Sequence, residues 1–406
     1  MKKYVIAGAS FRCYYMFAKN LTEKYRDKVS IEGIYDPNIT RSEFFNKNVD
    51  GKIKVYASFD EMMKAVKPDA VIVTTVDSFH HEYIIKALEY GCDAISEKPM
   101  TTDEVKCKAI TDAERKSGKK VYVTFNMRFT PYFVAIKELM MKKVLGRVLN
   151  VNYEHLLGKW HGADYFRRWH SNAAKSGSLL VHKSTHHLDI VNWLLDDTPQ
   201  TVTALGSLHY YGRNREMYGK RCADCAHKKS CEYYYDVSAD SLCSELYVKA
   251  EKNDGYMRDA CPFRDGIDIY DNMSLSVRYK KGALLTYNLT TYNPYEGYKI
   301  TVTGTDGRLE AYEVWDGAGA DDDCEIKLFE TGGKVTKITF PKAGGAHSGG
   351  DERLLKMLFE GGIEDKLGQC ASSFDGAASA LIGICAKKSI ETGKAVDIEQ
   401  YLDKLK

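Results

Sequence analysis

Two short polar clusters carry the residue types that acid–base chemistry needs. The first is Glu97-Lys98-Pro99, directly after the apolar stretch 93–96. Burial lowers the pKa of a lysine, so that it can donate a hydrogen bond or relay a proton near neutral pH. A neutral imidazole can accept a proton in the same pH range. When hydride leaves a carbon that bears a hydroxyl group, the hydroxyl proton must depart to a base within hydrogen-bond reach. The second cluster, within 182–189, contains His182, Lys183, His186 and Asp189.

The first element that must position Lys98 is a strand, turn and helix at the start of the chain. Residues 1–8 are β-formers that end at Gly8, and a helical stretch runs from the turn to Lys24. A second apolar strand, 29–35, ends at Asp36. An acidic residue at that place binds the 2′-hydroxyl of an adenosine ribose and repels a 2′-phosphate. The pattern therefore predicts a dinucleotide site that prefers NAD to NADP.

The phosphate turn itself is degenerate. Gly8, Ser10 and Cys13 stand where the dinucleotide motif has its three glycines. A pyrophosphate needs free backbone N–H groups and the positive end of a helix rather than particular side chains. The donors would come from Ala9, Ser10, Phe11 and Arg12.

Strands continue to alternate with helices through residue 124. An apolar run at 70–76, a helical segment at 81–90 and the strand 93–96 predict a parallel sheet. Ligands bind such a sheet outside the carboxyl ends of its strands. Thr74, Thr75 and Lys98 should therefore gather there with Gly8 and Asp36.

The length of the chain favours two domains, the first of the α/β class. The chain has 406 residues, more than one hydrophobic core usually serves, and we place a Rossmann domain at 1–124 and an α+β domain at 125–406. The net charge of +2 and the absence of long basic runs argue against a nucleic-acid partner. We find no export signal and no apolar run of about 18 residues, so we expect no membrane span and a cytoplasmic location.

The sequence pattern of the second domain predicts a largely antiparallel sheet. Its predicted strands are 148–156, 202–210, 273–279, 283–291 and 299–304, with turns at Lys281-Gly282 and Asp306-Gly307. Such a sheet can leave one face open as a platform. We expect a homo-oligomer built through that face.

The motifs together resemble the Gfo/Idh/MocA oxidoreductase family, the glucose–fructose oxidoreductase and inositol dehydrogenase group. The resemblance rests on the glycine-turn strand, Glu97-Lys98-Pro99, and Gly177-x-Leu followed by His186-x-x-Asp189 and a Trp-Leu-Leu helix. It implies that Lys98 contacts the oxidised hydroxyl, that His186 is the acid or base, and that His80 and Glu97 lie at the cofactor. The family often has an aspartate four residues before that histidine, where this chain has His182.

Further residues are candidates for gripping a carbohydrate or polyol. Asp189 should share a helix face with His186 and could orient a ring nitrogen or a sugar hydroxyl, whereas His187 points elsewhere and should only pack. The segment 126–131 resembles the family's interdomain crossover. The substrate-binding candidates are Arg128, Trp160, Arg168, His170 and His347.

These observations predict an NAD-dependent oxidoreductase that acts on a secondary hydroxyl of a sugar, glycoside or polyol. Two alternatives stay open. One is an NAD-dependent glycosidase that works by transient oxidation and elimination. The other is a non-catalytic sensor of NAD or sugar.

A cysteine-rich insertion at 212–265 interrupts the sheet. A Cys-x-x-Cys pair with further cysteines has the spacing of a tetrahedral thiolate site, and a metal could supply the folding energy that such a loop lacks. An iron–sulfur cluster or free thiols are the alternatives. We expect structural zinc on Cys222, Cys225, Cys231 and Cys261.

Overall fold

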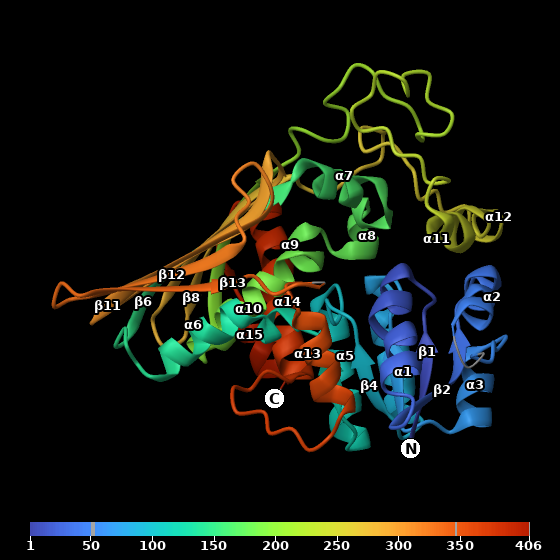
Figure 1. The fold of residues 1–406 in the computed structure, drawn as a ribbon, viewed down its shortest axis with the longest axis horizontal. Coiled ribbons are helices and arrows are strands. Elements are labelled where there is room, and N and C mark those ends of the chain that lie inside the picture. The colour runs from blue at the N-terminus through green and yellow to red at the C-terminus, as the bar shows by residue number, and fades with distance from the viewer. Residues whose placement is uncertain (50–52, 346, 406) are drawn as a thin grey trace.

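The computed structural model describes residues 1–49, 53–345 and 347–405, and in these residues the strands form one six-stranded and one nine-stranded sheet (Figure 1). The six-stranded sheet has the order β14-β5-β4-β3-β1-β2. All its neighbours are parallel except β14 and β5. Its strands are β1 (Lys2–Ala7), β2 (Val29–Tyr35), β3 (Ala70–Val73), β4 (Asp93–Ser96), β5 (Val121–Val123) and β14 (Ala371–Ser372).

The central strands of this sheet are apolar throughout because helices cover both faces. Every residue of β3 is buried, as are the last four residues of β1. The predicted parallel sheet is confirmed. The covering helices are a π-helix (Cys13–Ala18) that continues into α1 (Lys19–Lys24), then α2 (Ile39–Asn48), α3 (Phe59–Val66), α4 (His80–Glu89) and α5 (Glu104–Ser117).

The nine-stranded sheet has the order β13-β12-β11-β10-β6-β9-β8-β7-β15. Only β6 and β9 run parallel among its described neighbours; the other pairs are antiparallel. Its strands are β6 (Val148–Gly158), β7 (Pro199–Ser207), β8 (Asn272–Tyr279), β9 (Leu284–Asn293), β10 (Tyr295–Gly304), β11 (Gly307–Gly317), β12 (Asp323–Glu330), β13 (Val335–Pro341) and β15 (Val396–Asp397). The predicted antiparallel character is therefore confirmed.

Helices cover one face of this sheet and carry the second polar cluster. They are α6 (Pro131–Met141), α7 (Lys159–Arg167), α8 (Ala173–Ser176), α9 (Leu179–His182), α10 (Ser184–Leu195), α14 (Ser373–Thr392) and α15 (Glu399–Leu402). The long helix α14 approaches α9 closely, because a Cβ atom on Gly383 would lie 2.2 Å from the carbonyl oxygen of Leu180. This contact fixes the backbone that carries His182.

The chain returns to the first sheet after the second one is complete. Helix α13 (Gly350–Phe359) buries Leu354, Leu355 and Phe359 in the same apolar cluster as Ile6 of β1. Strand β14 then adds to the edge of β5. Residues 350–372 thus belong structurally to the nucleotide-binding half, although they follow the second sheet in sequence.

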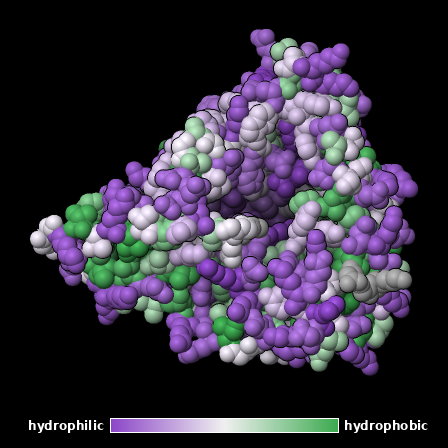
Figure 2. Space-filling model, in the orientation of Figure 1, coloured by the Kyte–Doolittle hydropathy of each residue, from purple (hydrophilic) through white to green (hydrophobic). Residues whose placement is uncertain are grey.

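The cysteine-rich insertion rises above α7 and descends beside α2 (Figure 1). Its regular elements are α11 (Ser241–Cys243), a π-helix (Ser244–Val248) and α12 (Glu251–Asp254). In the space-filling view a largely hydrophilic hollow opens between this insertion and the body of the molecule (Figure 2). In the described residues no helix has the length and apolarity that crossing a membrane requires.

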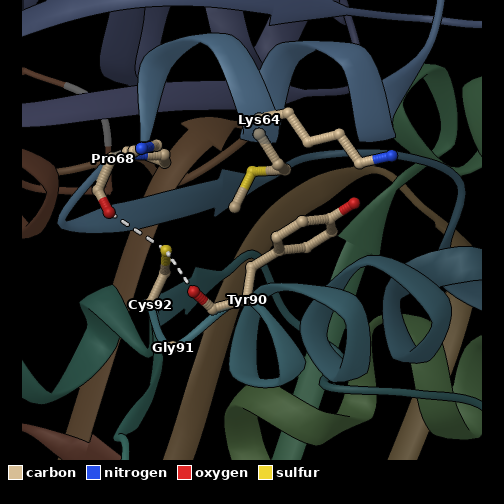
Figure 3. Close-up of a pocket in the computed structure, with 7 residues that line it drawn as sticks. Lys64, Pro68, Tyr90, Gly91 and Cys92 are labelled. Atoms are coloured by element: carbon tan, nitrogen blue, oxygen red, sulfur yellow. Dashed lines mark hydrogen bonds between the residues drawn. The ribbon is translucent and has the colours of Figure 1, made fainter.

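A separate hollow of about 420 Å³ lies at the opposite end of the first sheet (Figure 3). It is lined in part by Lys64, Pro68 and Tyr90, and the thiol of Cys92 donates to the Pro68 carbonyl at 3.0 Å. These residues precede strands β3 and β4. Ligands of parallel sheets bind at the carboxyl ends instead, so this hollow is not the cofactor site.

Candidate active site

The loop that carries Lys98 is tied to its neighbours at the carboxyl end of β4. The backbone N–H of Glu97 donates to the carbonyl of Val73 at 2.9 Å. The two ring nitrogens of His80 lie 2.8 Å from the Pro99 carbonyl oxygen and 3.0 Å from that of Thr75. The His80 ring therefore holds this loop against the loop after β3. It has a positioning role next to the expected nicotinamide site.

Lys98 points from this loop into the second domain. Its Nζ atom donates to the main-chain carbonyl of His182 at 3.1 Å. Burial lowers the pKa of Lys98 to about 8, although the nearby carboxylates of Asp77 and Glu97 act in the opposite direction. The ammonium group can therefore exchange a proton close to neutral pH.

His182 meets a carboxylate that the sequence analysis did not predict. Its Nδ1 atom lies 2.6 Å from Oδ2 of Asp77, which belongs to the 3-10 helix Asp77–Phe79 after β3. Burial, and then the charge of Lys98, hold the pKa of His182 well below its ordinary value. Burial also raises the pKa of Asp77. The carboxyl group absent from position 182 is thus supplied by the other domain.

His186 lies one helical turn further along, in α10, with an unused nitrogen. Among the described residues its Nδ1 atom has no hydrogen-bond partner, and the side chain is buried. Its ring centroid lies 5.9 Å from that of His347 and 6.2 Å from that of Phe125. Burial and then the charge of Lys98 lower the pKa of His186, so its imidazole is neutral and can accept a proton.

Lys183 lies between these two histidines in sequence and is buried. Its positive charge lowers the pKa of both Lys98 and His186, although burial is the larger cause in each case. His187 packs as expected: its Nδ1 atom lies 2.7 Å from the Tyr287 hydroxyl and its ring stacks on Tyr153.

Asp189 and Arg128 do not take the roles that we predicted for them. Arg128 donates through Nε and Nη2 to the two carboxylate oxygens of Asp189, at 2.8 and 2.6 Å. Both side chains are buried, and Arg128 also donates to the Gly368 carbonyl. Arg128 also forms an ion pair with Asp375 of α14 at 3.2 Å, so this buried network joins α10 and α14 to the crossover segment.

The turn after β1 has the geometry that a dinucleotide requires. Gly8 has φ of +102°, and a Cβ atom there would lie 2.6 Å from the backbone nitrogen of Thr75. Ser10 holds the start of the helix through its hydroxyl, which accepts from the Cys13 N–H, and the Thr74 hydroxyl donates to the Gly8 carbonyl. The small residues at the degenerate glycine positions therefore keep the turn tight.

Asp36 lies beside this turn, where a ribose would be recognised. Its carboxylate accepts from the backbone N–H groups of Ala9 and Asn38, each at 2.8 Å. Burial raises the pKa of Asp36, and these two donors oppose that effect. The Gly8 turn and this carboxylate fit NAD, and Gly8, Asp36, Thr74, Thr75 and Lys98 all follow strand ends of one sheet edge.

Arg12 links the turn to two other parts of the molecule. Its Nε atom donates to Glu97 at 2.9 Å, and its Nη1 and Nη2 atoms donate to the carboxylate of Asp351 in α13, at 2.6 and 3.0 Å. Glu97, predicted as a cofactor ligand, thus positions Arg12. The Phe11 N–H, a predicted phosphate donor, is bonded to the Tyr247 hydroxyl of the insertion at 3.0 Å.

The other predicted substrate residues occupy four different positions. His170 is buried with its ring centroid 4.1 Å from that of His182. Arg168 bonds to Asp164 and lies over the ring of Tyr165. His347 bonds to Asp351 at 3.2 Å and faces His186. Trp160, 53% exposed, lies at the start of α7 against Tyr233.

A second histidine–carboxylate pair near Tyr165 was missed. The Nδ1 atom of His161 lies 2.8 Å from Oε1 of Glu296, and the His161 ring stacks on Tyr165, which in turn contacts His182. The partners are far apart in sequence, so spacing could not reveal them. Asp77 was more accessible to prediction because it closely follows the carboxyl end of β3.

The zinc site that we predicted is not formed. Within the described ranges no group of three or more His, Cys, Asp or Glu side chains is arranged to hold a metal ion. All four cysteines are free, and the sulfur of Cys222 accepts a hydrogen bond from Arg167 at 3.1 Å. The described side chains likewise do not form the four-cysteine arrangement that an iron–sulfur cluster requires. The insertion is instead held by ion pairs.

Comparisons with known proteins agree with this geometry. The Gfo/Idh/MocA models described as "Oxidoreductase family, NAD-binding Rossmann fold" and "Oxidoreductase family, C-terminal alpha/beta domain" match residues 2–125 and 137–398. The chain belongs to this family. Gfo/Idh/MocA membership establishes an NAD(P)-dependent oxidoreductase acting on CH–OH groups.

Individual Gfo/Idh/MocA relatives extend the likeness over nearly the whole chain. YteT of Bacillus subtilis (strain 168), named as an oxidoreductase, is 36% identical over 98% of both chains. Inositol 2-dehydrogenase of Klebsiella pneumoniae (strain 342) is 25% identical over 46% of this chain and 56% of its own length. The solved structure of an Agrobacterium radiobacter oxidoreductase in complex with NAD+, L-tartaric acid and magnesium has a TM-score of 0.66 at 16% identity, with 98% and 99% of the two chains covered, and shows the shared fold.

Proposed function

We propose that this chain is an NAD-dependent dehydrogenase for a secondary hydroxyl of a sugar, glycoside or polyol. The observation that carries the proposal is the convergence of Lys98 from one domain with the His182 to His186 segment from the other. The relatives support the substrate class, because one of them is named an inositol dehydrogenase. Asp36 supports NAD over NADP, since its carboxylate would repel a 2′-phosphate.

The residues divide the proton chemistry between them. NAD, when bound, supplies the acceptor for the hydride. Lys98, as a cation, donates a hydrogen bond to the carbinol oxygen and stabilises the negative charge that develops there. The unpartnered Nδ1 atom of His186 accepts the hydroxyl proton.

The surrounding polar groups hold this arrangement and select the substrate. The main-chain carbonyl of His182 orients the Lys98 ammonium group, and Asp77 fixes the His182 ring. His170, Arg168 and the His161–Glu296 pair offer donors and acceptors suited to the hydroxyl groups of a carbohydrate. Trp160 offers an aromatic face against which a sugar ring can stack.

A test compares hydride transfer with cofactor binding. Stopped-flow absorbance of NADH on mixing with a panel of monosaccharides, glycosides and polyols should reveal the substrate. In Lys98→Met the rate should fall about 10²-fold or more, because one donor to the developing oxyanion is lost, while calorimetric NAD+ affinity should change little. Lys106→Met, which removes an ion pair with Asp103 and a hydrogen bond to the Thr102 hydroxyl, is the matched control. A wild-type rate in Lys98→Met would disprove the assignment.

A second candidate function is redox-neutral cleavage of a glycoside. Hydride removal from a ring carbon gives a ketone, base removal of the neighbouring C–H proton expels the glycosidic oxygen, water adds to the alkene, and the hydride returns. The observation that favours it is the contact of Tyr247 with the phosphate turn, since this contact suits a cofactor that stays bound. Product release without lasting NADH absorbance would identify it; NADH accumulating in proportion to product would exclude it.

We also propose that the open face of the nine-stranded sheet joins two copies of the chain. Along β7 and β11, residues alternate between the core and this face, which leaves Leu205 75% exposed and Tyr312 45% exposed. Sedimentation velocity of the wild type and Tyr312→Asp tests this proposal. The wild type should sediment as an oligomer and the variant should dissociate, whereas a monomeric wild type would overturn it.

A further inference from the structure

The insertion contains a segment, residues 240–258, that reaches from the second domain to the first; we call it the arm. Figure 1 shows α11 and α12 of this segment beside α2, far from the nine-stranded sheet where the insertion starts. The hollow in Figure 2 lies under this bridge. The arm thus closes one side of what would otherwise be an open groove.

Ion pairs tie the arm to the rest of the insertion and to α7. Arg221 donates through Nη1 to Glu251 at 2.6 Å and through Nη2 to Asp259 at 2.7 Å. Arg258 bonds to Asp164 of α7 at 3.3 Å. The arm is therefore attached to the substrate-binding half.

The tip of the arm is built into the nucleotide-binding half. Leu246 is fully buried in the apolar cluster that contains Ile34, Phe44 and Phe45. Asn38, itself 2% exposed, donates to the Ala250 carbonyl at 2.9 Å. Such a buried anchor, surrounded by hydrogen bonds, has to be withdrawn before the tip can lift.

The remaining contacts of the tip fall on the places that would hold the adenosine half of a dinucleotide. The Tyr247 hydroxyl accepts from the Phe11 N–H of the phosphate turn. Asp254 bonds to Arg41 at 2.6 Å, and Arg41 lies 4.0 Å from the ribose-recognising carboxylate of Asp36. The guanidinium of Arg41 is flanked by the rings of Tyr247 and Tyr256, at 5.7 and 5.6 Å.

We propose that the arm is a latch over the adenosine end of the cofactor groove, with Leu246 as its anchor and Tyr247 as its contact to the pyrophosphate. This inference rests on the cofactor site of the proposed function. A phenol can accept from the Phe11 N–H and donate to an anionic oxygen at the same time. Leu246 must leave the apolar cluster of the nucleotide-binding half before the groove opens. The dinucleotide therefore exchanges slowly and stays bound between turnovers.

The latch makes a kinetic prediction that a simple ligand contact does not. A closed latch lowers the fraction of protein that is open for exchange, so it slows association and dissociation together. Opening it should raise both rate constants of NADH and change the equilibrium constant much less. Loss of an ordinary contact would instead raise mainly the dissociation rate.

The experiment measures NADH binding and its displacement by excess NAD+ through nucleotide fluorescence, without substrate. In Leu246→Ala both rate constants should rise about tenfold or more, which corresponds to roughly 1.4 kcal/mol. Asn253→Ala, which removes surface bonds to Asn38 and Thr40, should act in the same direction and keeps the test sound if Leu246→Ala fails to fold. Tyr234→Phe, in the insertion outside the arm, is the control.

Each outcome separates the latch from the proposed function. If the wild type binds NADH and both arm variants exchange it within about twofold of the wild-type rates, the latch is wrong and the dehydrogenase proposal stands. If the wild type binds neither NADH nor NAD+, the cofactor site itself fails. Tyr247→Phe adds a check, since faster dissociation with unchanged association would assign Tyr247 a direct contact but no gating role.

Discussion

The Nδ1 atom of His182 and the Oδ2 atom of Asp77 lie 2.6 Å apart and join the two halves of the molecule across the site. His182 ends α9, which packs against α14, and Asp77 begins the 3-10 helix after β3. The same histidine offers its main-chain carbonyl to Lys98. The position of Lys98 therefore depends on the geometry of the His182–Asp77 pair.

Asp77→Asn should lower kcat by about 10²-fold with a small change in KM. The amide keeps the size of the side chain but removes the carboxylate that orients His182 and favours the charged form of Lys98. Steady-state kinetics check the size of the effect. Asp60→Asn, at a surface ion pair with Lys86, should behave as wild type. Equal losses in both variants would contradict a specific role for Asp77.

The rate of hydride transfer should fall as the pH rises through about 8. Burial lowers the pKa of Lys98 to about 8, so the cation that stabilises the developing alkoxide is lost above that pH. His186 stays neutral at the pH values below this fall in rate, because its pKa lies well below its ordinary value. Single-turnover rates from pH 6 to 10 measure the profile, and a rate that rises through pH 8 would make neutral Lys98 the base.

Lys183→Met supplies a check on that interpretation. Lys183 is one of the positive charges that lower the pKa of Lys98. Its removal should therefore move the alkaline limb to higher pH, and Asp77→Asn should move it to lower pH. Limbs that stay in place in both variants would show that another group titrates.

Arg128→Met should destabilise the fold by about 3–5 kcal/mol, because it leaves the buried carboxylate of Asp189 without its partner. Urea unfolding measures the loss. The double variant Arg128→Met/Asp189→Leu should recover much of it, since no unpaired buried charge remains; Asp375, which also pairs with Arg128, has a side chain that is 36% exposed. Arg213→Met, at an exposed pair with Asp265, is the control and should leave stability unchanged. Comparable destabilisation by the single and double variants would contradict this account.

Chelation should not destabilise the protein, since among the described residues no group of three or more His, Cys, Asp or Glu side chains is arranged to hold a metal ion. The midpoint of thermal unfolding should be the same before and after treatment with EDTA. Cys225→Ser and Cys231→Ser should fold normally, whereas Cys222→Ala should cost about 1–3 kcal/mol because the buried Arg167 loses an acceptor. One zinc ion per chain, measured by mass spectrometry, would restore the zinc hypothesis.

Local pattern was enough to predict the two sheets and the clusters at Lys98 and His186. It failed where a side chain's role depends on a distant partner. The face shared by His186 and Asp189 follows from helix geometry, but Arg128, which neutralises Asp189, lies 61 positions away, and Asp77 lies 105 positions from His182. The Cys-x-x-Cys spacing likewise gives no information on whether Cys261 comes near.

Strand β13 was missed for a different reason. Residues of β13 alternate only between exposed and half-buried positions, so the strand has no buried face. Its pairing with β12 is set by backbone hydrogen bonds and by surface charges such as Lys337 with Glu325. A pattern that relies on alternating apolar residues cannot detect such a strand.

The return of α13 and β14 to the first sheet makes the two halves inseparable as recombinant fragments. A polypeptide that ends at residue 124 would lack β14, so the edge of β5 would have no hydrogen-bonding partner. It would also expose to solvent the apolar surface that Leu354 and Leu355 cover. Bare edges of this kind recruit other chains and precipitate. Swapping the nucleotide-binding half between homologues therefore requires transplanting residues 350–372 along with it.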